Sequence, residues 1–121
     1  MRAASRLASF GHALRGLKVW LSQPNARIQC VAGLVVVGLG LWCEVSAAEW
    51  TALVLAMGLV LSAEAMNTAV EKVVDLASPE WHPLARDAKD VAAAAVLLCS
   101  ITAALVGLLV FVPYLREQAG L

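Results

Sequence analysis

The sequence predicts an all-α membrane protein: one domain over residues 1–121, with an N-terminal amphipathic surface helix and three transmembrane helices. Hydrophobic residues make up 61% of the 121 residues, and the mean hydropathy of +0.79 is too apolar for a soluble domain of this size. Charged residues make up only 15% and lie in clusters between long apolar runs. The formal net charge is zero, so no overall field favours nucleic acid as a partner.

The first helix is expected over about residues 2–22. Five apolar side chains recur there at steps of three and four, the spacing of one helix face: Leu7, Phe10, Leu14, Leu17 and Leu21. Basic and polar side chains lie largely off this stripe, a pattern typical of a helix on an anionic membrane surface. A helix packed on protein would show the same stripe, and both can hold. The arginine-rich, acid-free start is also a feature of mitochondrial transit peptides, but no processing boundary separates it from the next helix.

Three transmembrane helices are expected, at about residues 26–43, 46–77 and 83–113. Each contains a long run without charge, at residues 28–43, 50–63 and 91–112. The second helix would be about 48 Å long, which exceeds the bilayer core of about 30 Å. Its last turns therefore have to emerge from the hydrocarbon.

Small and capping residues support this division. Gly33, Gly38 and Gly40 in the first transmembrane run permit close approach of another helix. Ser46 followed three residues later by Glu49 forms a capping-box pattern, which predicts a helix start at this point.

The polar segments predict the orientation. The loop 44–49 holds two acids and no Lys or Arg, whereas the N-terminal arm and the connection 78–90 carry basic residues. By the positive-inside rule, the arm and the connection are cytoplasmic and the C-terminus lies outside.

Polar residues interrupt the end of the second apolar run. At about 100° per residue, and with Glu64 at zero, Asn67 lies near −60°, Glu71 near −20° and Asp75 near +20°. Ionised groups near bilayer depth cost roughly 2.5–3.5 kcal/mol each, so a shared stripe of them indicates a functional site. The alternatives are a polar seam that joins helices, or the ordinary water-exposed end of a membrane helix.

These residue types fit metal-assisted phosphoryl transfer. That reaction needs Mg²⁺ to neutralise phosphate charge, a cation near the γ-phosphate and a group to take the attacking proton. The stripe and Lys89 supply such groups at the cytoplasmic interface, where a lipid alcohol would present its hydroxyl. The P-loop pattern and the protein-kinase glycine loop are both missing from the sequence.

The motifs resemble one family closely. The run Glu64-Ala-Met-Asn67-Thr-Ala-Val-Glu71-Lys-Val-Val-Asp75, followed by His82-Pro-Leu-Ala and by Ala88-Lys89-Asp90, is similar to the signature of the prokaryotic diacylglycerol kinase and undecaprenol kinase family. The resemblance implies a homotrimeric kinase of the bacterial cytoplasmic membrane, with active sites shared between subunits. Its implied donor is ATP with Mg²⁺. Its implied reaction is the phosphorylation of diacylglycerol to phosphatidate, or of undecaprenol to undecaprenyl phosphate.

The same resemblance implies roles for individual residues. Glu64 matches the catalytic base with Asn67 beside it, and Glu71 matches a carboxylate that holds Mg²⁺ with ATP. Six further residues match positions that contact the nucleotide: His12, Glu80, Trp81, His82, Lys89 and Asp90.

One position departs from the family pattern. Gln23-Pro24 occupies the region where the family has a second metal-binding glutamate, and the chain has no acid before Glu44. An amide oxygen can ligate Mg²⁺ but brings no charge. Three outcomes stay open: weaker metal binding, substitution by another carboxylate such as Asp75, or a poor kinase.

Two other classes of function stay open as well. A non-enzymatic or catalytically impaired membrane protein of this fold is favoured by the departure at Gln23. A proton or ion pathway lined by Glu64 and Glu71 would require an oligomer, and would leave the charged pair Lys89-Asp90 without a role.

Overall fold

Four α-helices form the protein in the computed structural model, which describes residues 2–121, with side chains from residue 4 onward. They are α1 (Arg2–Leu21), α2 (Pro24–Cys43), α3 (Ala47–Ala77) and α4 (Pro83–Gln118). The last three are long and apolar enough to cross a membrane. The predicted all-helical architecture with three candidate membrane spans is therefore confirmed.

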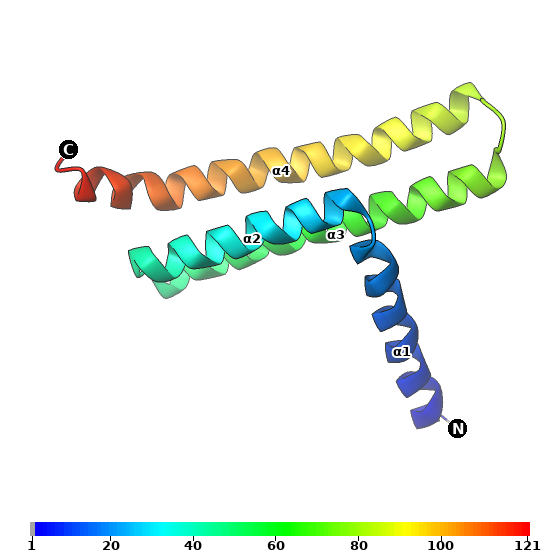
Figure 1. Ribbon diagram of the computed structural model, residues 1–121, viewed down its shortest axis with the longest axis horizontal. Helices are drawn as coiled ribbons and strands as arrows, with labels where there is room; N and C mark the ends of the chain where they lie inside the picture. Colours follow the sequence, from blue (N-terminus) through cyan, green and yellow to red (C-terminus); the bar gives the residue numbers. More distant parts are fainter. Residues whose placement is uncertain (1) are drawn as a thin grey trace.

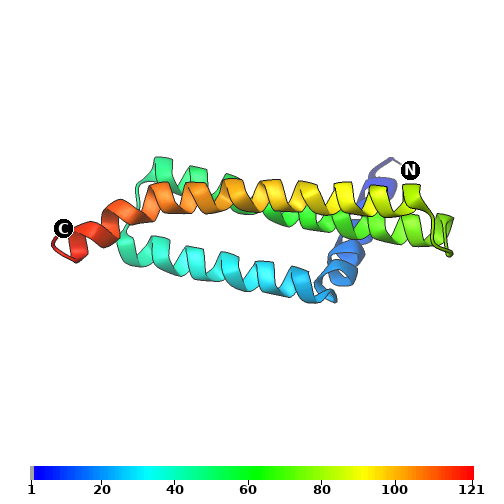
Figure 2. The same ribbon diagram turned by 90° about the horizontal axis from the view of Figure 1, so that it is seen from above.

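Helices α2, α3 and α4 lie side by side, and α1 leaves them at a steep angle (Figures 1 and 2). The α3 and α4 helices run antiparallel and form the most extensive helix pair. Because α2 begins beside the middle of α3, the far ends of α3 and α4 extend beyond the point where α1 departs. The short connection between these two helices thus stands clear of the rest of the bundle.

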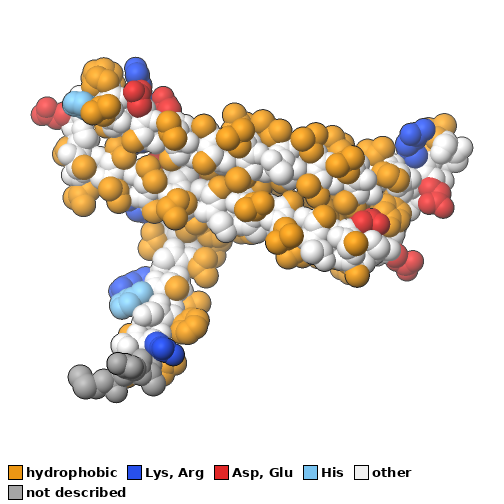
Figure 3. All heavy atoms as spheres, turned by 180° about the vertical axis from the view of Figure 1, so that it is seen from behind, with side chains coloured by type: hydrophobic (Ala, Val, Ile, Leu, Met, Phe, Trp, Pro, Cys, Tyr) orange, Lys and Arg blue, Asp and Glu red, His pale blue; other side chains and the backbone are white. Residues whose placement is uncertain are grey.

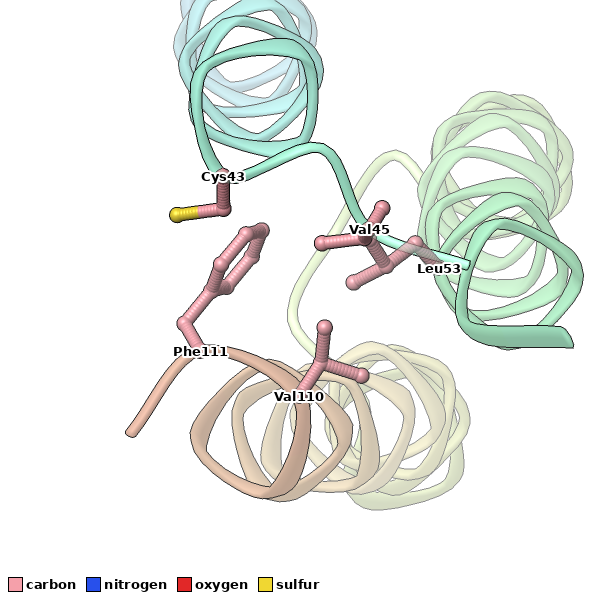
Figure 4. Packing of buried hydrophobic residues seen from close by; sticks show 5 residues of the cluster. All are labelled: Cys43, Val45, Leu53, Val110 and Phe111. Carbon is pink, nitrogen blue, oxygen red and sulfur yellow. The ribbon is translucent and has the colours of Figure 1, made fainter. Parts of the chain in front are cut away.

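The opposite end of the bundle is closed by a small apolar core. Five buried side chains from α2, α3, α4 and the α2–α3 loop meet there: Cys43, Val45, Leu53, Val110 and Phe111 (Figure 4). Close packing of α2 on α3 at this end depends on a glycine. A Cβ added at Gly40 would lie 2.5 Å from the Trp50 ring, whereas one at Gly38 would meet nothing within 4 Å. Of these two glycines, Gly40 is the one that permits close approach within the chain.

The predicted N-cap of α3 is present. The Ser46 Oγ accepts a hydrogen bond from the Glu49 N–H at 3.2 Å, and the Ser46 hydroxyl donates to the Glu49 Oε1 at 3.0 Å. The Tyr114 hydroxyl of α4 donates to the same carboxylate oxygen at 2.9 Å. The start of α3 is thereby tied to the last turns of α4.

Two helix ends differ from the expectation. The last helix was expected to stop at about residue 113, but α4 continues through Pro113 to Gln118. Proline removes one backbone donor, and the turn beyond it is held by the packing of Tyr114 on the core and its bond to Glu49. The first membrane helix begins at Pro24 rather than near residue 26, because proline is well tolerated in a first helical turn.

The outer surface of the bundle is apolar between charged ends. Large hydrophobic side chains such as Leu34 and Leu109 are more than two-thirds exposed. In the space-filling view, charged side chains gather at the two ends and on α1, and hydrophobic side chains cover the length between them (Figure 3). A surface of this kind requires an apolar solvent, which a bilayer supplies.

Candidate active site

The buried face of α3 changes from apolar to polar along its length. Leu53, Ala56 and Val60 are buried, and the same face continues into the buried polar residues Glu64, Asn67 and Thr68. Glu64 is 5% exposed and Asn67 is 8% exposed. Burial of polar groups is costly, so a polar stretch at core positions of the helix is a candidate functional site.

Asn67 lies at the centre of this polar face. Its Nδ2 donates a hydrogen bond to the Glu71 Oε1 at 3.2 Å, one turn further along α3. Its Oδ1 is buried and has no hydrogen-bond partner among the described residues. The neighbouring Thr68 hydroxyl is satisfied, since it donates to the Glu64 carbonyl at 3.1 Å. The Asn67 Oδ1 is thus a buried acceptor that the described part of the chain leaves unpaired.

The joint between α1 and α2 faces this polar stretch. A cavity of about 110 Å³ is lined by Glu64, Thr68 and Glu71 of α3 and by Gln23, Pro24 and Asn25 of the joint. The Arg27 Nε donates to the Leu21 carbonyl at 3.0 Å and braces the joint. Gln23 therefore lies beside the two carboxylates even though more than 40 residues separate them in sequence.

The donor set of this cavity fits a Mg²⁺ ion bound together with a phosphate ligand. Within the described part of the chain, no three His, Cys, Asp or Glu side chains gather to form a complete metal cage. Mg²⁺, however, is usually held by one or two carboxylates, with waters and substrate phosphates as the other ligands. Glu64, Glu71 and Gln23 line the cavity, so two carboxylate residues and one amide residue are at hand to hold such an ion.

A second hollow lies at the connection between α3 and α4. It has a volume of about 300 Å³, and it brings together five of the six residues expected at a nucleotide: Glu80, Trp81, His82, Lys89 and Asp90. The His82 Nδ1 accepts from the Leu84 N–H at 3.1 Å and caps α4. Trp81 is 75% exposed, so its ring is free to stack on a ligand.

We call the hollow between α3 and α4 the connection cleft, and the cavity lined by Gln23, Glu64 and Glu71 the Gln23 cavity. Asp75 lines the connection cleft and does not line the Gln23 cavity. The Lys89 Nζ donates a hydrogen bond to the Asp75 Oδ1 and forms an ion pair with it. Asp75 thus does not line the cavity with Glu71 in this arrangement, and its substitution for the missing glutamate as a metal ligand stays a prediction. Gln23 is the side chain that occupies the place beside Glu71.

The sixth expected residue, His12, lies apart from the connection cleft. Its Nδ1 accepts a hydrogen bond from the Arg15 Nη2 at 2.9 Å on α1. Both residues line an apolar groove of about 690 Å³ between α1 and α3, together with Trp20, Thr68 and Lys72. Sequence reasoning missed this groove, whose only signal was the run of small residues on α1 and α3 that face it. Thr68 borders both this groove and the Gln23 cavity.

Known proteins resemble this chain over most of its length. The family model described as prokaryotic diacylglycerol kinase matches residues 11–111. An undecaprenol kinase of Bacillus subtilis is 39% identical over 108 residues, which cover 88% of each chain. A diacylglycerol kinase of Escherichia coli is 36% identical over 94 residues, which cover 77% of each chain.

A match of this extent includes the α3 polar face, the connection and the joint between α1 and α2. The chain therefore belongs to the prokaryotic diacylglycerol kinase family.

Proposed function

We propose that this protein is a lipid kinase that transfers the γ-phosphoryl group of ATP to the hydroxyl group of a membrane lipid alcohol. The observation that carries the proposal is the buried polar face of Glu64 and Asn67, continued by Glu71, on a helix that is otherwise apolar. This face lies where a polar cavity and an apolar groove meet at Thr68. Membership of the family supports the same reaction class.

Each polar residue has a proposed role. Glu64 takes the proton of the attacking lipid hydroxyl, and Asn67 beside it orients the Glu71 carboxylate through the hydrogen bond from its Nδ2. Glu71 and Gln23 hold Mg²⁺ together with ATP at their shared cavity. When bound, the ion offsets the negative charge of the phosphates. Lys89 offsets charge on the γ-phosphate from the connection cleft.

The apolar groove between α1 and α3 is the proposed entrance for the acceptor. Its walls include Leu17, Val19 and Ala69, and Thr68 connects it to the cavity that holds Glu64. An acyl or prenyl chain would fit such walls, since apolar surface leaves water favourably. The adenine would lie in the connection cleft near Trp81 and His82.

Membrane placement follows the same proposal. The apolar side chains Leu7, Phe10 and Leu14 of α1 are at least 66% exposed, which suits an amphipathic helix lying on the cytoplasmic face of a bacterial inner membrane. The active site then opens to the cytoplasm, where ATP is available. A homotrimer with shared sites is proposed, because the family resemblance implies it and because His12 does not line the connection cleft of its own chain.

The experiment that tests the proposal is a radiolabelled-ATP assay of the purified protein with undecaprenol and diacylglycerol as alternative acceptors. We expect Mg²⁺-dependent phosphorylation, with undecaprenol preferred, and no turnover by Glu64→Gln although it assembles normally. Near-normal lipid phosphorylation by Glu64→Gln would falsify the role of Glu64 as the base.

A catalytically impaired protein of this fold is the second candidate, and the observation that favours it is the uncharged Gln23 at the cavity. Absence of lipid phosphorylation at saturating Mg²⁺ and ATP, from an intact oligomer, would select it.

A further inference from the structure

Lys89 and Asp75 form an ion pair that joins two helices at the connection end of the bundle. The Lys89 Nζ on α4 donates to the Asp75 Oδ1 on α3. The other ion pair in the described part of the chain, between Arg86 and Asp87, joins neighbours within α4. Among the described residues, Lys89 is therefore the one cation whose place is set by a carboxylate of another helix.

Folding stability does not account for this pair. The side chains of Lys89 and Asp75 are 40% and 66% exposed, and exposed ion pairs add little to stability because water and salt screen them. The α3 and α4 helices also pack against each other along the bundle and share the buried core at its far end. They do not depend on the pair to stay together.

The position of the pair suggests a role toward phosphate. The connection cleft carries the carboxylates of Asp75, Glu80 and Asp90, and a phosphate chain there needs a well-placed cation. Two cations line the cleft, Lys89 and Arg86, and Arg86 is paired with its neighbour Asp87. An ammonium group has three N–H donors, and after one bond to Asp75 two remain for phosphate oxygens. A free lysine side chain spreads its charge over many rotamers. Asp75 limits Lys89 to those rotamers that keep the ammonium group at the cleft.

The spacing along α3 fits one extended ligand. Asp75 follows Glu71 by four residues, which corresponds to about 6 Å along the helix and nearly the same face. The carboxylate at the Gln23 cavity and the carboxylate that holds Lys89 thus lie on adjacent turns. A triphosphate chain is long enough to extend over one helical turn of about 6 Å.

We propose that Asp75 is a positioning residue that holds the Lys89 ammonium group where it meets the transferred phosphate. The inference rests on the proposed function, since it takes ATP as the phosphoryl donor. Asp75 acts through Lys89 and need not touch the nucleotide itself.

A double-mutant cycle tests this inference on the full-length protein in mixed micelles with the acceptor lipid. Asp75→Asn is expected to lower kcat/KM for ATP by about 10- to 100-fold, the scale of a small misplacement of a catalytic group. Lys89→Met is expected to lower it at least as much. Asp75→Asn should add no further loss in the Lys89→Met background, because the two act as one unit. Asp75→Glu should restore part of the activity, and its melting temperature should match that of the wild type.

Asp87→Asn is the matched control, because it breaks the other exposed pair near the cleft without touching Lys89. It should leave kcat/KM unchanged. The inference is overturned if the two losses of kcat/KM multiply in the double variant. It is also overturned if Asp87→Asn loses as much kcat/KM as Asp75→Asn does.

The failure of the inference is distinguishable from the failure of the proposed function. An active wild type with unchanged Asp75→Asn kinetics overturns only the inference. A wild type that neither phosphorylates lipid nor retains radiolabelled ATP in equilibrium dialysis overturns both. If the wild type binds ATP without turnover, the same double-mutant cycle is measured on the dissociation constant for ATP. Losses of affinity that multiply in the double variant then overturn the inference.

Discussion

Replacement of Asn67 by leucine should stabilise the protein while it removes activity. Asn67 is 8% exposed, and its Oδ1 is buried without a hydrogen-bond partner. Its Nδ2 makes one bond of 3.2 Å to Glu71, whose side chain is exposed. The amide therefore brings one satisfied and one unsatisfied polar group into the core.

The expected gain in the free energy of unfolding follows from these contacts. An unpartnered buried acceptor destabilises a fold by about 1–3 kcal/mol, whereas a typical hydrogen bond contributes only about 0.5–1.5 kcal/mol net. Leucine keeps the branched skeleton of asparagine and adds about 1.5–3 kcal/mol when fully buried. Its larger methyl groups cost about 1–3 kcal/mol where they crowd the site. The balance is a stabilisation of roughly 1 kcal/mol.

Thermal unfolding followed by circular dichroism in detergent micelles measures the stability, and the radiolabelled-ATP assay measures the activity. Asn67→Leu should unfold at a higher temperature and phosphorylate lipid at least about 100-fold more slowly. Thr68→Val is the matched control for stability, because the Thr68 hydroxyl is already satisfied by the Glu64 carbonyl and its removal should bring no gain. An Asn67→Leu protein that unfolds below the wild type would refute the reasoning, since the cost of crowding and of the lost bond to Glu71 would then exceed the gain from removing the buried amide.

Other predictions concern the metal cavity and the packing of α2. Glu71→Gln should raise the Mg²⁺ concentration for half-maximal activity about tenfold, and Gln23→Glu should lower it, because the cavity loses or gains one carboxylate. Mg²⁺ titrations at saturating ATP check both, and an unchanged midpoint in Gln23→Glu would argue against a ligand at that position. Gly40→Ala should be less stable than Gly38→Ala by about 1–3 kcal/mol, because only the first Cβ would collide with the Trp50 ring. Both variants gain the same helix propensity, so the difference between their free energies of unfolding measures the collision with Trp50 alone. Equal free energies of unfolding would show that no such collision occurs.

Periodicity within one helix predicted the polar face of α3. Counting residues from Glu64 placed Asn67 and Glu71 on one side, and the two side chains are hydrogen-bonded there. The capping residue Ser46 was likewise evident from the spacing to Glu49. Such local features are readable because helix geometry fixes the positions of residues three and four apart.

Contacts between helices could not be predicted in the same way. The pairing of Asp75 with Lys89 depends on the register of α3 against α4, which no repeat in either helix specifies. The place of Gln23 beside Glu71 depends on the turn between α1 and α2, and only the family resemblance drew attention to that residue. The continuation of α4 past Pro113 was missed because tertiary packing outweighed the local effect of proline.

Because α1 departs beside the middle of α3, the protein has two separate openings, the groove between α1 and α3 and the connection cleft. In the proposed function, the groove between α1 and α3 opens toward the bilayer, while the connection cleft, carried further out by the ends of α3 and α4, opens toward the aqueous phase. On that proposal, ATP and the lipid alcohol arrive from different media, and they meet where the groove borders the Gln23 cavity at Thr68. An inhibitor bound at one of the two openings would leave the other open. Its inhibition would therefore be non-competitive with respect to the substrate that enters by the other opening.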